Sequence, residues 1–120
     1  MKKILFVYAA SLLLLACGNK DAGEVKTEKL AGSALKSTFK VWGNCETCKE
    51  TIEGSLKVDG VTEASWSPET KMLSVSYDTT KINLDQVEKN IAAAGYDNVK
   101  YKGDDNAYAN LPQCCKYERK

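Results

Sequence analysis

The chain has 120 residues and a formal net charge of +1, with 17 basic and 16 acidic side chains, five cysteines and no histidine. This length fits one small domain, and the near-neutral charge excludes the basic surface of a typical nucleic-acid-binding protein. Because the commonest general base is missing and no nucleophile–base pair stands out, we expect no enzymatic activity.

The first sixteen residues have the pattern of a secretory signal peptide. Two lysines precede an apolar run over residues 4–16 that is too short to span a bilayer; a buried N-terminal helix is the alternative. The letters LLAC, ending at Cys17, resemble the lipobox of bacterial lipoproteins, in which the cysteine is lipidated. We therefore predict lipidation of Cys17 and a location in the bacterial cell envelope, facing the periplasm or the cell surface. Loss of residues 1–16 removes two lysines and no acid, which lowers the net charge from +1 to about −1.

The rest of the chain divides by composition and periodicity. Residues 17–36 are small and polar and predict a lipidated N-terminus followed by a flexible tether. From residue 38 the apolar pattern alternates between the period of a strand and that of a helix. It predicts strands over 38–42, 61–66, 71–77 and 98–101, one helix after the cysteines to residue 56, and a second helix capped by Asn83 and stopped by Gly95. This order is an α+β, ferredoxin-like βαββαβ sandwich over 37–101, with a four-stranded antiparallel sheet and two helices on one face.

Cys45 and Cys48 lie between the first predicted strand and the first predicted helix. A helix N-terminus lowers the pKa of a thiol through its dipole and free amides, so both cysteines favour the reactive thiolate. Metal binding, thiol–disulfide exchange and a structural disulfide are all compatible with this spacing. A c-type haem site is excluded because Lys49, not histidine, follows the second cysteine.

Four segments together resemble the heavy-metal-associated domain of bacterial copper chaperones, metal-pumping ATPases and the periplasmic mercuric-ion-binding protein. They are the Cys-x-x-Cys, VDGV at 58–61, VSYD at 75–78 and AAAGYDNV at 92–99. The resemblance implies that the thiolates of Cys45 and Cys48 take one soft ion and pass it to a partner by ligand exchange. It also implies that Tyr96 lies close to the metal, as a second-shell residue. Where the family usually has methionine, this chain has Gly43, so we expect either Trp42 to fill that space or the loop to be mobile.

Residues 102–120 form a C-terminal tail with two adjacent cysteines, Cys114 and Cys115. Adjacent cysteines seldom bridge each other, because the small ring needs a distorted peptide bond. An intermolecular disulfide, or pairing with the Cys-x-x-Cys thiols after oxidation, is one alternative. The other is that Tyr108 and Leu111 pack the tail onto the domain and bring both thiols to the metal as further ligands.

We therefore predict a lipid-anchored protein that binds a soft heavy-metal ion for transfer or sequestration in the cell envelope. Cu(I) is the first candidate and Hg(II) also suits two thiolates, whereas Zn(II) or Cd(II) would suit four. The expected partners are a metal transporter or another metal carrier, met transiently, and the membrane through the lipid anchor. A thiol–disulfide redox protein that uses the same cysteines is the alternative function, and an interaction module with stapling cysteines is a third.

Overall fold

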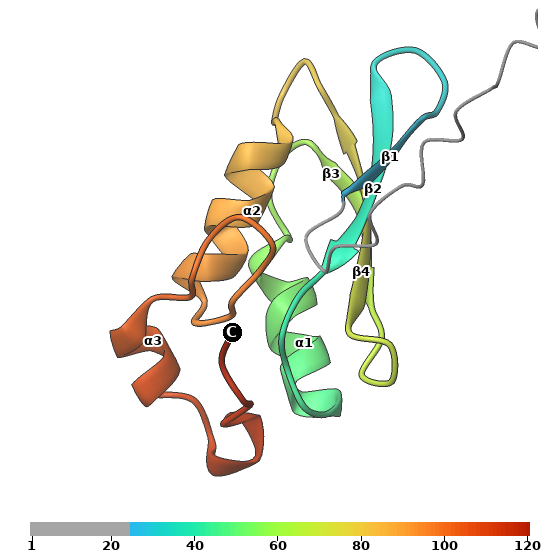
Figure 1. Cartoon of the computed structure of the whole chain (residues 1–120). Coiled ribbons are helices and arrows are strands. Elements are labelled where there is room, and N and C mark those ends of the chain that lie inside the picture. Colours follow the sequence, from blue (N-terminus) through green and yellow to red (C-terminus); the bar gives the residue numbers. More distant parts are fainter. Residues whose placement is uncertain (1–24) are drawn as a thin grey trace, which may run out of the picture.

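The computed structural model describes residues 25–120 (Figure 1). The predicted signal peptide and the predicted lipidation site, Cys17, lie outside these residues. Within them, no helix is long and apolar enough to cross a bilayer.

The structure is built on one four-stranded antiparallel sheet. Its strands are β1 (Lys26–Lys29), β2 (Ala34–Lys40), β3 (Val61–Trp66) and β4 (Met72–Asp78), in the spatial order β1-β2-β4-β3. In the register of the central strands, Phe39 of β2 and Trp66 of β3 both lie opposite Leu73 of β4. Side chains alternate across a strand, so β2 and β4 direct Phe39, Leu73, Val75 and Tyr77 into the core.

Two helices, α1 (Glu46–Ser55) and α2 (Leu84–Ala93), lie on the same face of the sheet (Figure 1). α2 begins as the sequence predicts: the Asn83 side chain accepts from the Gln86 amide at 2.9 Å, and Gln86 accepts from the Asn83 amide at 3.2 Å. This reciprocal pair satisfies two amides that a helix start leaves free. α1 buries Cys48 and Ile52 against the sheet. The α+β class, the four-stranded antiparallel sheet and the two helices are confirmed.

The fourth strand is not the one that the sequence predicts. Residues 98–101 form no strand and make one isolated bridge, between Asn98 and Val41. The Asn98 side-chain oxygen accepts from the amides of Lys100 and Tyr101 at 3.1 and 3.0 Å, which holds the chain in a tight turn. The edge of the sheet beside β2 is occupied by β1 instead.

β1 also changes the predicted tether over 17–36. Residues 26–29 and 34–36 belong to a β-hairpin, with Lys26 opposite Thr38 and Lys29 opposite Leu35. All four residues of β1 are exposed, so apolar periodicity could not reveal the strand. Lysines on an edge strand also discourage further strand pairing.

The C-terminal tail folds onto the domain through two short elements, α3 (Asp105–Ala109) and the 3₁₀ turn η1 (Gln113–Cys115). Gly103 allows this close approach: a side chain there would come within 2.6 Å of the Gly95 backbone. The core consequently includes two tail residues, Cys115 and Tyr117. Tyr108 and Leu111 pack against the same core, which agrees with one of the two alternatives that the sequence left open for the tail.

Candidate metal centre

Cys45 and Cys48 are positioned by the start of α1. Cys45 is the N-cap residue, with extended backbone angles of −142° and −177°, and Cys48 lies in the first turn of the helix. Their Sγ atoms are 3.9 Å apart. Cys45 is half-buried and Cys48 is fully buried, so one thiol of the pair is open to solvent and the other faces the core.

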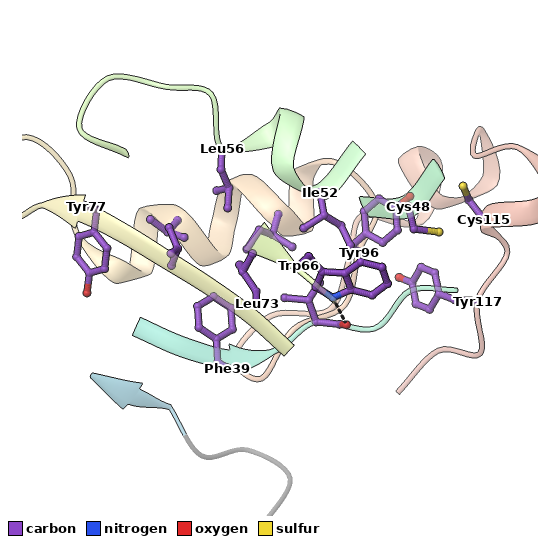
Figure 2. Close-up of a cluster of buried hydrophobic side chains, with 14 of the residues drawn as sticks. Phe39, Cys48, Ile52, Leu56, Trp66, Leu73, Tyr77, Tyr96, Cys115 and Tyr117 are labelled. Carbon is purple, nitrogen blue, oxygen red and sulfur yellow. Dashed lines mark hydrogen bonds between the residues drawn. The ribbon is translucent and has the colours of Figure 1, made fainter. Parts of the chain in front are cut away.

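Trp66 of β3 supports the loop that carries these cysteines. A Cβ atom on Gly43 would lie 2.9 Å from the Trp66 indole and 3.4 Å from the Cys48 Cβ. The indole nitrogen donates to the Val41 carbonyl at 3.0 Å (Figure 2). Trp66, and not the predicted Trp42, therefore fills the space beneath the loop, and Trp42 instead stays half-buried with the Lys40 ammonium over its ring.

The tail adds a third thiol to this pair. The Sγ atoms of Cys45, Cys48 and Cys115 all lie within 4.8 Å of one another. Figure 2 shows Cys48, Cys115, Tyr96 and Tyr117 together at one end of the core, far from Tyr77. The structure thus brings together three of the four cysteines that the sequence singles out.

Cys114 is not part of this cluster. Its side chain is exposed, and its backbone carbonyl accepts from the Cys45 thiol at 3.4 Å. Its Sγ lies 3.9 Å from that of Cys115. The two neighbouring cysteines therefore have different surroundings, one buried in the cluster and one at the surface.

Tyr117 and Arg119 hold the tail in place. The Tyr117 hydroxyl donates to the Gly95 carbonyl at 2.7 Å and accepts from the Asp97 amide at 2.9 Å. Arg119 donates to the buried Asp97 carboxylate at 2.8 Å and to Asp105 at 2.7 Å. Sequence reasoning missed both residues. An aromatic residue and an arginine shortly after Cys115, in an otherwise polar tail, are the sequence feature that could have indicated an anchored tail.

Tyr96 is where the sequence places it, next to the cysteines. Its side chain is fully buried and stacks on Tyr117 with the ring centroids 5.5 Å apart. Within residues 25–120 its hydroxyl is the one buried side-chain oxygen or nitrogen without a hydrogen-bond partner. Burial and the adjacent thiols of Cys48 and Cys115 raise its pKa well above the usual value, so the hydroxyl keeps its proton.

The thiols differ in acidity. The backbone amide of Cys48 and then that of Thr47 donate toward Cys45 at the helix start, which lowers the pKa of Cys45 to about 7 despite some desolvation. Burial, and then the neighbouring Cys48, raise the pKa of Cys115 to about 12. Near neutral pH the Cys45 thiol is therefore partly ionised, whereas Cys115 keeps its proton.

Comparison with known proteins identifies the central part of this architecture. The model of the heavy-metal-associated domain matches residues 38–97, which include both cysteines of the Cys-x-x-Cys but not Cys115. A zinc-transporting ATPase of Synechocystis sp. is 43% identical over 54 residues, which are 44% of this chain and 8% of that protein. The chain thus spans only a small part of this relative.

Copper chaperones are matched over most of their length. CopZ of Staphylococcus aureus is 39% identical over 55 residues, which are 45% of this chain and 81% of CopZ. A solved structure of a CopZ metallochaperone superimposes with a TM-score of 0.51 at 35% identity, covering 52% of this chain and 97% of that one.

Proposed function

The chain belongs to the heavy-metal-associated domain family, and we propose that it binds one soft metal ion through Cys45 and Cys48, with Cys115 as a third sulfur ligand. On this proposal it is a binding protein and not an enzyme. The similarity to copper chaperones supports Cu(I) as the cargo.

The observation that carries the proposal is the cluster of three thiols from two separate parts of the chain. A metal ion that binds sulfur at about 2.3 Å places two sulfurs about 4.6 Å apart in a linear site and about 4.0 Å apart in a trigonal one. The sulfurs of Cys45 and Cys48 are 3.9 Å apart. This separation favours an ion held by three sulfurs over one held between two.

The donor chemistry favours soft ions. Thiolates select Cu(I) and Zn(II), whereas the absence of histidine from the chain disfavours Cu(II) and Ni(II) sites. Hg(II) also suits this site. Zn(II) and Cd(II) prefer four ligands and the cluster supplies three, so the Cys114 thiol, 3.9 Å from that of Cys115, would have to join it as the fourth.

The buried Tyr96 hydroxyl supports a bound thiolate. It has a proton to donate and no partner within the described residues. A hydrogen bond from this hydroxyl to a metal-bound sulfur of Cys48 or Cys115 would satisfy it and reduce the negative charge on the sulfur. We therefore propose that Tyr96 slows loss of the ion by donating this hydrogen bond.

Coverage of the site by the tail favours sequestration or slow transfer. A receiving protein exchanges the ion by bringing its own thiolate to the metal, and Cys115 occupies one approach to it. The tail has to lift before a metal transporter or another carrier can take the ion.

A lipid on Cys17 would hold the protein at the cell envelope, facing the periplasm or the cell surface. Lipid attachment is tested by a mass shift that disappears in Cys17→Ala.

The experiment for the binding proposal is an anaerobic Cu(I) titration of the reduced protein against a chelator of known affinity. We expect one Cu(I) per chain, loss of binding in Cys45→Ser and weaker binding in Cys115→Ser. Cys114→Ser is the matched control. The exposed Cys114 thiol is not one of the three clustered sulfurs, so its loss should leave the affinity for Cu(I) unchanged. Failure of the protein to compete with the chelator would refute the copper proposal, and parallel titrations with Hg(II), Zn(II) and Cd(II) rank the other ions.

The lowered pKa of Cys45 favours a second candidate, thiol–disulfide exchange. Cys45 would attack a disulfide substrate as thiolate, and Cys48, 3.9 Å away, would resolve the mixed disulfide. A reduction potential within the range of dedicated oxidoreductases, together with turnover of a disulfide substrate, would support this function. A chain that turns over no disulfide substrate would exclude it.

A further inference from the structure

We propose that the thiols of Cys45, Cys48 and Cys115 also form a receptor for trivalent arsenic or antimony. The inference rests on the proposed function, because it uses the same reduced thiols. It names a different class of ligand, the neutral hydroxides of trivalent metalloids, and makes Cys115 the residue that determines specificity for them.

The donor set contains sulfur alone. The cluster consists of three cysteines, and among residues 25–120 no acidic side chain joins it. Trivalent arsenic and antimony are soft centres that bind three thiolates and exchange oxygen ligands for sulfur. A trivalent metalloid therefore uses every thiol in the cluster.

Charge favours a trivalent centre. Three thiolates around Cu(I) carry a net charge of −2, those around Hg(II) carry −1, and those around trivalent arsenic carry none. Cys48 and Cys115 are completely buried, and an unbalanced charge at a buried position is costly. In the described part of the chain, the hydrogen bonds to the three sulfurs come from the backbone amides of Asn44, Thr47 and Cys48 and from other thiols, and none comes from lysine or arginine. The neutral complex therefore fits these surroundings best.

The geometry agrees with three-coordinate binding. A three-coordinate centre, planar or pyramidal, with sulfurs at about 2.3 Å holds them no more than about 4.0 Å apart. Cys45 and Cys48 already meet this condition at 3.9 Å, and Cys115 completes a set that lies within 4.8 Å. The half-exposed Cys45 gives a small neutral hydroxide a point of entry, and the anchored tail supplies the third thiol from the same chain.

The binding step is a condensation without oxidation or reduction. One molecule of arsenous acid reacts with three thiols. Three As–O bonds and three S–H bonds break, three As–S bonds form, and each leaving hydroxide takes one thiol proton to give three water molecules. The oxidation state of arsenic stays at three, so no electron donor or acceptor is needed.

Arsenite titration of the reduced full chain, read by intact mass, tests the inference. We expect one arsenic per chain with the loss of three protons, in the wild type and in the matched control Cys114→Ser. Cys115→Ser should lose this adduct and still bind Cu(I) through the remaining pair. Circular dichroism and a urea midpoint report whether this variant folds; if it does not, the half-exposed Cys45→Ser carries the same test of the adduct.

A parallel Cu(I) titration of the same samples separates this inference from the proposed function. A wild-type chain that binds Cu(I) but no arsenite overturns the arsenite inference and leaves the proposed function standing. Equal arsenite binding by the wild type and by a folded Cys115→Ser also overturns it. A reduced chain that binds neither arsenite nor Cu(I) overturns both.

Discussion

The carboxylate of Asp97 is completely buried, and the Arg119 guanidinium lies 2.8 Å from it. Arg119 also donates to the Gly103 carbonyl at the base of the tail. This pair ties the end of the tail to the loop that follows α2, and it thereby keeps Cys115 over the other two thiols. The tail is held by a specific buried contact and not only by apolar packing.

Replacement of Arg119 by glutamine should release the tail. The substitution leaves the buried Asp97 charge without its ionic partner, which should lower the free energy of unfolding by about 3 kcal/mol. Transfer of bound metal to a competing chelator should become faster, because Cys115 is no longer held in place. Urea unfolding and stopped-flow transfer measure the two effects.

Lys102→Gln is the matched control for this variant. Lys102 forms an ion pair of 4.0 Å with Asp105, and both side chains are mostly exposed. Such a pair contributes at most about 1 kcal/mol, so stability and transfer should both stay close to the wild-type values. Equal effects of the two substitutions would contradict a specific role for Arg119.

Acid should weaken the same anchor. Burial by itself raises the pKa of Asp97, but hydrogen bonds from Arg119 and from the amides of Lys120 and Gly103 outweigh it and hold the pKa below the usual value. A carboxylate whose pKa is lower in the folded chain stabilises it fully above the unfolded pKa of about 3.9. The stabilisation is lost as the pH falls through the lower pKa of the folded chain.

The acid effect is measured by urea midpoints of the wild type and Asp97→Asn between pH 7 and pH 3. The wild type should be more stable than the variant at pH 7, and the difference should shrink below about pH 4 as the Asp97 carboxylate takes up its proton. Other carboxylates titrate in both proteins and cancel in the difference. A difference that stays constant over this range would show that the charge of Asp97 does not hold the tail.

The sequence predicts those parts of the fold that have a clear apolar period or a local cap. The two helices, three of the strands and the Asn83 cap belong to this group. β1 has no apolar side chain to reveal it, and residues 98–101 look like a strand because their alternation does not show that Asn98 turns the chain. Tertiary contacts decide both segments.

The sequence likewise predicts only part of the candidate site. Cys45, Cys48 and Tyr96 follow from motifs of fixed spacing, and the structure places them together. The separation of Cys115 from Cys114 does not follow, because both are cysteines in one short tail. It depends on η1 and on the anchors formed by Tyr117 and Arg119, which are contacts with distant residues.

A methyl group at Gly43 should disturb the loop that carries Cys45 and Cys48. In Gly43→Ala the new Cβ would lie 2.9 Å from the Trp66 indole, and overpacking of this kind costs about 1–3 kcal/mol. The affinity for Cu(I) should fall as well, because the shifted loop carries Cys45. Urea unfolding and chelator competition give the two values.

Gly54→Ala is the matched control for Gly43→Ala. Gly54 lies in α1 with nothing within 4 Å of its added Cβ, so alanine should stabilise the helix by about 0.5–1 kcal/mol and leave the Cu(I) affinity unchanged. The same glycine-to-alanine change should therefore lower the free energy of unfolding at residue 43 and raise it at residue 54. A stabilised Gly43→Ala would show that Trp66 does not support the loop.

Tyr96→Phe should have opposite effects on the free and the metal-loaded chain. Removal of a buried hydroxyl without a partner should raise the free energy of unfolding of the metal-free protein by about 1 kcal/mol. Loss of its hydrogen bond to a metal-bound sulfur should speed release of the ion roughly tenfold. Urea unfolding of the metal-free protein and dissociation kinetics of the Cu(I) form measure these effects.

Tyr77→Phe provides the comparison for Tyr96→Phe. The Tyr77 hydroxyl is hydrogen-bonded to the Ser37 hydroxyl at 3.0 Å, far from the thiols (Figure 2). Its removal should destabilise the chain by about 1 kcal/mol and leave metal release unchanged. Slower or unchanged release in Tyr96→Phe would rule out a hydrogen bond from the Tyr96 hydroxyl to a metal-bound sulfur.

The central claim is that a single ion is held by three sulfurs, the third of which comes from the tail. X-ray absorption of the Cu(I)-loaded full chain measures the number of sulfur ligands directly. The account predicts three sulfurs per copper in the wild type and in Cys114→Ser, and two in Cys115→Ser. Two sulfurs per copper in all three proteins would contradict it, and would reduce the tail to a cover over a two-thiolate site.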